Sequence, residues 1–225
     1  MYRDLSHPIE SGMQTFPGDP PVNVSQAATV PEDGVEVKEL CCGSHTGTHI
    51  DAPCHTEPDG DALEDRPVGE YVFDARFVDV APCEPRERID SEAIVDALAV
   101  EDPPEVLVIR TGYDAHWNSD AYRDHPYLAP EVASRLRAAG CGVAIDTLNP
   151  DPTPSPSSTE PSPADDEPDG VPVHRELLGR DLPILENLTA LEGLPDRFTL
   201  YAFPLPLRAG DGAPVRAVAA LEERS

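Results

Sequence analysis

His45-Thr-Gly-Thr-His49-Ile-Asp51-Ala-Pro-Cys-His55 is the most informative stretch of this 225-residue chain. Its eleven residues contain three of the seven histidines of the chain, together with one aspartate. Imidazole nitrogens and carboxylate oxygens are the ligands that Zn²⁺ and Mn²⁺ prefer. Because the four groups are close in sequence, holding them together costs little loop entropy. The stretch therefore predicts a metal site, although two histidines four residues apart also occur by coincidence.

We do not expect this stretch to be helical, because Gly47 and the β-branched residues around it lower helix propensity. The chain is expected instead to wrap round an ion, with His45, His49 and Asp51 pointing inward. Asp51 has two oxygens and could bridge two ions. His55 follows a proline, and a histidine that lies near a metal without binding it can move protons.

The charge of the chain is strongly acidic. Asp and Glu number 43 against 16 Lys and Arg, which gives a formal net charge of -27, and Lys38 is the only lysine. The acidic residues are spread along the whole chain. This is typical of halophilic cytoplasmic proteins, in which salt screens the mutual repulsion of surface carboxylates. A cationic partner is the alternative, whereas nucleic acid is disfavoured because its phosphates would be repelled.

Cysteine usage and hydropathy indicate the compartment. The five cysteines are odd in number and show no CxxC spacing, which favours buried free thiols in a reducing compartment. The N-terminus has no apolar signal-peptide region, and no apolar run reaches transmembrane length. We expect a cytoplasmic protein without a membrane partner. Its length is sufficient for one core, so residues 1–225 are expected to form one domain.

Apolar patterning predicts an α/β fold with a mixed sheet and few helices. Alternation over 35–41 predicts a half-buried strand that leads into the histidine stretch. Further strands are expected over 2–6, 70–81, 105–111, 142–146, 198–203 and 215–221. Helices are expected over 90–98, with Asp90-Ser91 as the cap, over 130–139, where Pro130 begins and Gly140 ends the helix, and as a turn over 174–178.

The tract over 150–170 consists mainly of Pro, Ser, Thr, Asp and Glu. Because it has almost no apolar content, we expect it to add nothing to the core. We interpret it as an acidic, mobile surface loop inside the single domain. The segment that follows is too short to form a second domain.

The histidine stretch resembles the signature H-x-G-T-H-x-D-x-P-x-H of the cyclase-like hydrolases, a family that includes bacterial kynurenine formamidases and isatin hydrolases. Weaker similarities follow in the family's order over Asp4–Ile9, Pro17–Pro20, Arg110–Gly112, Tyr127-Leu128, Ile145–Thr147 and Pro214–Ala219. The resemblance implies a β-rich swivelling β/β/α fold with metals in a pocket. It also implies a homodimer or homotetramer.

The resemblance further implies a centre of two divalent ions, Zn²⁺ or Mn²⁺. Its ligands would be His45, His49, Asp51, His174 and Glu186. Asp51 would bridge the ions, and His55 would donate and accept protons. His174 and Glu186 have the family's spacing of twelve residues. Without the resemblance, His174 would be interpreted as an ordinary surface histidine.

The activity that the resemblance implies is hydrolysis of an amide or formamide C–N bond in a small molecule, most concretely N-formyl-kynurenine. A cyclic amide or lactone such as isatin is an alternative substrate, and a metal-binding protein without catalysis is a third possibility. Phe16 replaces the family's pocket tryptophan and would line the substrate pocket or anchor the core. Cys54 would be a structural thiol or, as an alternative, a thiolate ligand.

Overall fold

A nine-stranded mixed sheet forms the centre of the structure, a computed structural model that describes residues 1–90, 92–154 and 167–221. Its strand order is β1-β13-β11-β5-β7-β9-β10-β4-β12. The strands are β1 (Tyr2–Asp4), β4 (His49–Asp51), β5 (Val72–Asp79), β7 (Val106–Arg110), β9 (Gly142–Ile145), β10 (Ile184–Glu186), β11 (Arg197–Tyr201), β12 (Gly212–Pro214) and β13 (Val218–Ala220). β5, β7, β9 and β10 run parallel to one another, whereas the outer strands pair antiparallel. The predicted α/β class with a mixed sheet is confirmed.

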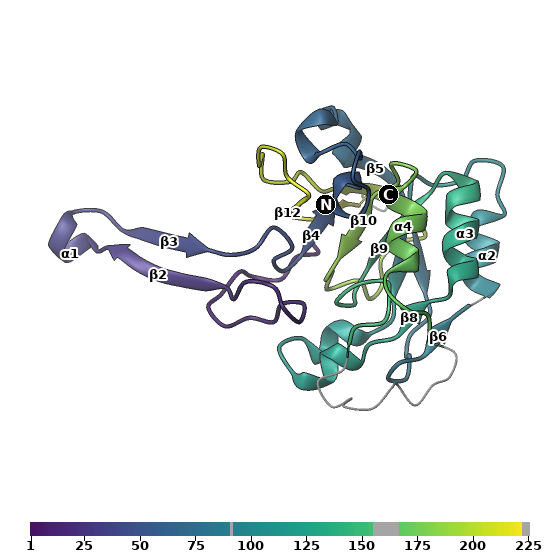
Figure 1. Ribbon diagram of the computed structural model, residues 1–225, viewed down its shortest axis with the longest axis horizontal. Helices are drawn as coiled ribbons and strands as arrows, with labels where there is room; N and C mark the ends of the chain where they lie inside the picture. Colours follow the sequence, from purple (N-terminus) through teal and green to yellow (C-terminus); the bar gives the residue numbers. More distant parts are fainter. Residues whose placement is uncertain (91, 155–166, 222–225) are drawn as a thin grey trace.

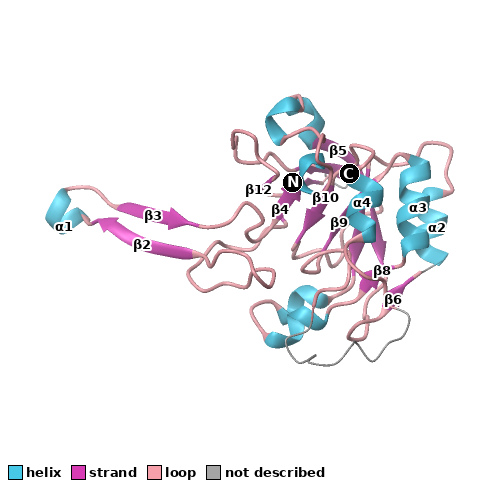
Figure 2. Ribbon diagram, in the orientation of Figure 1, coloured by secondary structure: helices cyan, strands magenta, loops and turns pink. Residues whose placement is uncertain are grey.

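The middle strands are apolar along their length because both faces of the sheet are covered. In β7, Val106 and Val108 point into the core on one face, and Leu107 and Ile109 point into the core on the other. Helices cover the second face (Figure 2). They are α2 (Glu92–Leu98), α3 (Pro130–Ala139) and α4 (Pro172–Leu178).

The predicted helix over 130–139 matches α3 at both ends. Pro130 occupies the first turn, where its missing N–H costs nothing, and Gly140 ends the helix with a φ of 68°. The helix predicted over 90–98 corresponds to α2. Of its proposed cap, Ser91 lies outside the described residues.

A long hairpin leaves the body of the molecule (Figure 1). It consists of β2 (Asn23–Ala28), the short helix α1 (Val30–Asp33) and β3 (Val37–Cys41), and we call residues 23–41 the arm. The prediction of a half-buried strand over 35–41 is wrong in its burial, because all five residues of β3 are exposed. Alternation of apolar and polar residues indicates that one face of a strand is apolar. It does not indicate whether other residues of the same chain bury that face.

Short strands account for the other differences from the predicted elements. β4, β10 and β12 have three residues each, too few for a periodic pattern, and none was predicted as a strand. The strand expected over 215–221 is only β13, because the chain leaves β4 at Pro214 and joins β1 and β11 at Val218. A two-stranded sheet of β6 (Arg88–Ile89) and β8 (Tyr127–Leu128) lies below the main one.

The acidic tract over 150–170 is not a surface loop throughout, and this prediction is corrected at its start. Asp151 and Thr153 are 0% and 1% exposed. His125 holds the tract in place, since its Nε2 lies 2.7 Å from the Thr153 hydroxyl. At the other end, the guanidinium of Arg86 pairs with Glu167. Polar residues are buried here because hydrogen bonds satisfy them, and residues 155–166 lie outside the described part.

All five cysteines are free, as expected, but only Cys141 is buried. The prediction of buried thiols is therefore wrong for the other four, of which Cys41 lies exposed on the arm.

None of the described helices combines the length and apolar character needed to cross a membrane.

Candidate metal centre

The pairing of two short strands brings distant acidic and histidine residues together. β10 runs antiparallel to β4, and Glu186 lies opposite His49 in the register. His49 and Asp51 are two residues apart in a strand, so their side chains share one face. His49 Nε2 lies 3.2 Å from Glu186 Oε2 and 3.4 Å from Asp51 Oδ1. The strand pairing thus assembles one histidine and two carboxylates.

Helix α4 adds His174 to this face of the sheet. Its Nε2 lies 3.1 Å from Glu186 Oε1 and 3.4 Å from Asp51 Oδ2. Its Nδ1 donates a hydrogen bond of 2.7 Å to Asp151, a residue that also accepts the backbone N–H groups of Val173 and His174. Asp151 therefore fixes the helix start and the orientation of the imidazole together.

The hydrogen bonds of the two buried imidazoles determine which nitrogen faces the site. His49 Nδ1 lies 2.8 Å from the carbonyl oxygen of Gly47, which can only accept, so Nδ1 carries the proton. Asp151 does the same for Nδ1 of His174. In the neutral rings, both Nε2 atoms then present lone pairs to the carboxylates, an arrangement common for metal-binding histidines. Gly47 has a φ of +61°, which favours glycine at this position.

Three atoms at the middle of the cluster test whether a cation fits. His49 Nε2, Asp51 Oδ2 and Glu186 Oε1 are buried, and none has a hydrogen-bond partner among the described residues. Lone pairs that face one another in a buried site are costly unless a positive charge lies between them. The donor set of imidazole nitrogens and carboxylate oxygens suits a divalent ion. The residues therefore fit a metal.

The pKa values of the same residues show that the site stabilises positive charge. Burial lowers the pKa of His49, but the carboxylates of Asp51 and Glu186 beside its Nε2 outweigh burial and raise this pKa to about 10. Burial also lowers the pKa of His174, but Asp151 and Asp51 outweigh burial and raise this pKa well above the ordinary value. Asp51 remains ionised, since His174 and His45 lower its pKa despite complete burial. Metal ions and protons therefore compete for this site.

His45 and His55 lie at the more open side of the centre, on either side of Asp211. His45 Nδ1 lies 2.9 Å from Asp51 Oδ1, and its Nε2 lies 3.1 Å from Asp211 Oδ2. The same carboxylate oxygen is 3.6 Å from His55 Nδ1. The next residue, Gly212, begins strand β12 beside β4. A Cβ atom at Gly212 would lie 2.6 Å from Cε1 of His45, so only glycine leaves room for this ring.

Two groups of ligand atoms can be drawn in the cluster, and they share Asp51. One comprises His49, Asp51 and Glu186, and the other His45, Asp51 and His55, with atoms within 4.8 Å of one another in each. The structure thus brings together all six residues predicted for the centre. It groups His49 with Glu186 rather than with His45, and it places His55 within reach of a ligand group. Which residues bind an ion remains a prediction.

The cavity beside the cluster contains the residue predicted to bind substrate. Phe16 lines it together with Leu148, Asn149 and the centre's histidines. Phe16 also packs on the small aromatic cluster of Tyr113 and Tyr122. Phe16 thus lines a cavity and also packs on a cluster of the body, and its role in substrate binding stays a prediction.

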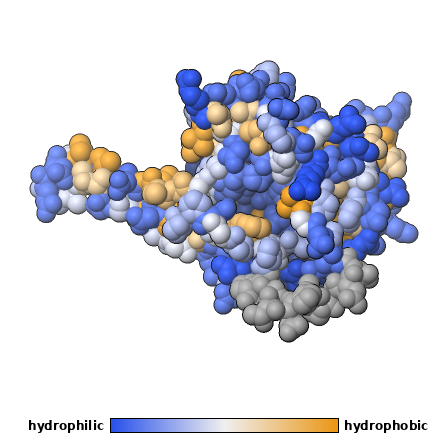
Figure 3. Space-filling model, in the orientation of Figure 1, coloured by the Kyte–Doolittle hydropathy of each residue, from blue (hydrophilic) through white to orange (hydrophobic). Residues whose placement is uncertain are grey.

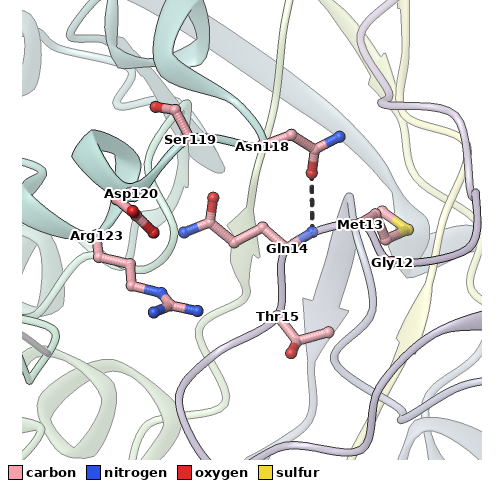
Figure 4. A pocket seen from close by; sticks show the side chains of 8 residues that line it. All are labelled: Gly12, Met13, Gln14, Thr15, Asn118, Ser119, Asp120 and Arg123. Carbon is pink, nitrogen blue, oxygen red and sulfur yellow. Dashed lines mark hydrogen bonds between the residues drawn. The ribbon is translucent and has the colours of Figure 1, made fainter.

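The loop that carries Phe16 also lines a second, polar pocket (Figure 4). There the backbone N–H of Gln14 donates a 2.8 Å hydrogen bond to Oδ1 of Asn118. Asn118 in turn donates from Nδ2 to Glu10. The side chain of Gln14 extends toward Asp120 and Arg123. These contacts fix the position of the loop and, with it, that of Phe16.

Asp151 and Asp211 are the contributors that sequence reasoning missed. Both are single acids among 43, and neither belongs to a recognisable spacing with the histidines. The only signal was the position of Asp151 at the start of the acidic tract. Cys54 is absent from both ligand groups, and its thiol lies 3.8 Å from the carbonyl of Gly210.

The sequence matches a known protein family and its members. A family model named Cyclase, described as "Putative cyclase", matches residues 3–152. The chain is 32% identical over 228 residues to the kynurenine formamidase of Paracidovorax citrulli, with 97% of this chain and 95% of that protein aligned.

Solved structures show the same fold. An isatin hydrolase bound to the product analogue thioisatinate superposes with a TM-score of 0.84 at 20% identity, covering 99% of this chain and 92% of that one. A protein from Bacillus stearothermophilus, described as a predicted metal-dependent hydrolase, gives a TM-score of 0.73 at 24% identity, with 97% of each chain covered. At this level of identity, the likeness concerns the fold alone.

Proposed function

The chain belongs to the cyclase family, and on that premise we propose that it is a metal-dependent hydrolase that cleaves an amide or formamide C–N bond. The most concrete reaction is that of an arylformamidase, which converts N-formyl-kynurenine to kynurenine and formate. One observation carries the proposal: two ligand groups, one of which includes the partly exposed imidazole of His55, share the buried carboxylate of Asp51.

The centre would hold two divalent ions, Zn²⁺ or Mn²⁺. Their ligands would be His45, His49, Asp51, His174 and Glu186. Bound ions of this kind make a coordinated water acidic near neutral pH and stabilise charge that develops on a carbonyl oxygen. Asp51, which both groups share, would be a ligand common to both ions.

His55 would accept a proton from the attacking water during cleavage. Burial lowers its pKa below the ordinary value, and Asp51 opposes this, so the ring is neutral near neutral pH and can accept a proton. The proton would then pass from His55 to the leaving nitrogen. An aniline nitrogen is only weakly basic, which makes an aryl formamide a favourable substrate. Asp211 lies within 3.6 Å of His55 Nδ1 and would orient the ring.

The pocket walls would select the substrate. Phe16 and Leu148 present apolar surface beside the histidines. An aromatic ring packed there would displace water from the reacting carbonyl. Asn149 and Asn187 line the same cavity and could accept or donate hydrogen bonds to polar groups of the substrate.

Formate release from N-formyl-L-kynurenine by protein loaded with Zn²⁺ or Mn²⁺ tests the proposal. Isatin and a lactone in the same assay test the alternative substrates. Cleavage of N-formyl-L-kynurenine well above that of isatin supports the arylformamidase. If only isatin is opened, the hydrolase remains and the substrate assignment is wrong. If none of the substrates is turned over by metal-loaded protein, the non-catalytic metal-binding alternative is favoured.

We further propose three properties of the whole protein. Its small-molecule substrate would be met in the cytoplasm, since the composition suits a reducing compartment. Its surface carboxylates would suit high salt, as the net charge of -27 indicates. The chain would act as a homodimer or homotetramer, as its family resemblance implies.

A further inference from the structure

The polar pocket beside the loop of Phe16 lies outside the metal centre and has a charged lining of its own. Residues 12–15 of that loop form one side, and residues 118–120 with Arg123 form the other. Its volume is about 190 Å³. Sites for drug-sized molecules have volumes of about 300–1,000 Å³, so this pocket suits a smaller, polar ligand.

Arg123 and Asp120 present opposite charges to this pocket. Their side chains converge there with the side chain of Gln14 (Figure 4). No ion pair joins Arg123 or Asp120 to each other or to another residue in the described part of the chain. An acid and a base that face one small cavity without pairing leave both charges available to a ligand.

Three buried polar atoms at the same pocket also lack hydrogen-bond partners among the described residues. They are Nε of Arg123 and both polar atoms of the Gln14 amide. Burial of such atoms without a hydrogen bond costs free energy. The flexible side chain of Gln14 can turn its amide toward an occupant of the pocket. An occupant that both accepts and donates hydrogen bonds would therefore stabilise this region.

The acidic charge of the chain restricts which small ligand can enter. Hydrophilic side chains cover most of the visible face of the body (Figure 3), and the net charge of -27 repels anions. Asp120 repels them within the pocket as well. A zwitterion has no net charge. Its carboxylate can accept hydrogen bonds from Arg123 and from the amide N–H groups of Gln14, while its ammonium group can pair with Asp120.

We propose that the polar pocket binds a free α-amino acid, with the carboxylate on Arg123 and the ammonium group on Asp120. A guanidinium can bind a carboxylate through two parallel hydrogen bonds, which fixes its orientation. None of the residues that line the pocket belongs to either ligand group of the metal centre. The inference therefore goes beyond the proposed reaction and does not depend on it.

A bound amino acid would also act on the wall of the cavity at the metal centre. Gln14 lies two residues before Phe16, which lines that cavity. Residues 118–123 directly follow Trp117, which packs on the same aromatic cluster as Phe16. A ligand that joins Gln14 to Arg123 would hold these two segments together and restrict the movement of Phe16.

Nuclear magnetic resonance of the ¹⁵N-labelled, full-length protein as purified tests the site, with L-alanine as the probe. The signals of Arg123 Nε–H and of the Gln14 side-chain amide report on the pocket directly. They are assigned by their absence in Arg123→Gln and in Gln14→Leu. Both signals should shift, and the shifts should saturate as L-alanine is added. No shift at either group, or shifts that rise without saturation, would show that water alone fills the pocket and would overturn the proposal.

Two analogues test the recognition of both charges. Propionate lacks the ammonium group and ethylamine lacks the carboxylate, so each should bind at least about tenfold more weakly than L-alanine. Binding of propionate as strong as that of L-alanine would make the pocket an anion site and contradict the pairing with Asp120. Equal binding of ethylamine would contradict the role of Arg123.

The two variants also test the residues. In Arg123→Gln, the Gln14 amide remains as the reporter, and in Gln14→Leu the Arg123 Nε–H remains. Affinity for L-alanine should fall at least about tenfold in Arg123→Gln, because a hydrogen-bonded charge is lost, and should also fall in Gln14→Leu. Arg135→Gln, at an exposed arginine of α3 outside the pocket, is the matched control and should bind as the wild type does.

Circular dichroism must show that each variant is folded, and if one variant does not fold, the other decides. Wild-type affinity in the folded variants would overturn the assignment of the site.

Discussion

His49, His174 and His55 have the same side chain but different partners, and the partners separate their tasks. In His49 and His174, an acceptor holds the Nδ1 proton, so each Nε2 presents a lone pair to buried carboxylates. His55 is more exposed, and its Nδ1 lies 3.6 Å from Asp211. An imidazole that can turn toward solvent and substrate suits proton transfer better than ligation.

Replacement of His55 by alanine tests this division. Loss of a general acid–base group lowers kcat by about 10²–10⁴-fold, so His55→Ala should fall in this range. Its metal content should equal that of the wild type, because His55 is not among the proposed ligands. Metal analysis beside steady-state kinetics checks both parts. His116→Ala, in an exposed histidine of the same chain, is the control. Loss of an ion from His55→Ala would make His55 a ligand and contradict its role in proton transfer alone.

The residues of the centre were predictable to different degrees. His45, His49, Asp51 and His55 stand in one dense stretch, and such density is rare enough to be informative. His174 and Glu186 were found only through the family resemblance, because a lone histidine carries no pattern. Asp151 and Asp211 could not be found, since their role depends on contacts across the fold and acids are abundant in this chain.

At the level of elements, strand β4 positions the centre because it lies between two antiparallel neighbours. Glu186 of β10 and Pro214 of β12 both pair with His49. A shift of β4 by one residue would turn His49 and Asp51 into the core and Ile50 into the site. Ile50 is 1% exposed on the core side, and its burial holds the register.

Gly212→Ala tests the packing of β12 on His45. The new Cβ would lie 2.6 Å from Cε1 and 3.0 Å from Nδ1 of His45, so the ring or the strand has to move. We expect metal affinity to fall by about 10–100-fold, the range seen when support of a ligand is lost. Titration of the metal-free protein with Zn²⁺, followed by calorimetry, measures the change.

Gly69→Ala is the matched control for this substitution, because no heavy atom lies within 4 Å of a Cβ placed there. It should bind metal as the wild type does. Equal affinities for Gly212→Ala and the wild type would show that the contact between β12 and His45 does not position the ligand.

The buried contact between His125, just before β8, and Thr153 of the acidic tract should make the free energy of unfolding depend on pH. Burial lowers the pKa of His125 to about 4, whereas an unfolded histidine titrates near its ordinary value of 6.5. Below pH 6.5, His125 is protonated in the unfolded chain but stays neutral in the folded chain. The contribution of His125 to the free energy of unfolding is therefore lost as the pH falls from 6.5 to 4. From pH 7 to 5 the loss is about 2 kcal/mol.

Urea unfolding at pH 7 and pH 5 measures this effect. In His125→Gln, the decrease in the free energy of unfolding between the two pH values should be smaller than in the wild type by about 2 kcal/mol. His116→Gln, at an exposed histidine, should keep the wild-type decrease. Identical decreases in His125→Gln and the wild type would show that His125 does not resist protonation.

Helices and strands were predictable where the sequence shows a pattern of apolar residues or has Pro and Gly residues that mark the ends of the element. β5, β7, β9 and α3 have apolar runs or terminal Pro and Gly residues, and each was found close to its observed bounds. The three-residue strands around the centre carry no period, so only tertiary pairing defines them. The arm was misjudged because its pattern of alternation is that of a strand covered by its own chain.

For the whole molecule, the net charge of -27 is the dominant property. Carboxylates distributed over the surface repel one another in the folded state and less so in the expanded chain. An acidic surface also disfavours contact between two copies of the chain. Salt should therefore favour both folding and assembly.

The melting temperature should rise with NaCl concentration. Screening shortens the Debye length from about 10 Å at 0.1 M to about 3 Å at 1 M, so most of the rise should occur in this range. Differential scanning calorimetry over a NaCl series measures it. A melting temperature that stays constant or falls over the same range would contradict the proposal of a surface suited to high salt.

The sharing of Asp51 by two ions is the central claim, and anomalous diffraction from crystals grown with Zn²⁺ tests it most directly. We expect two anomalous peaks, both within coordination distance of the Asp51 carboxylate, with His45, His49, His174 and Glu186 around them. A single peak, or peaks remote from Asp51, would contradict the claim.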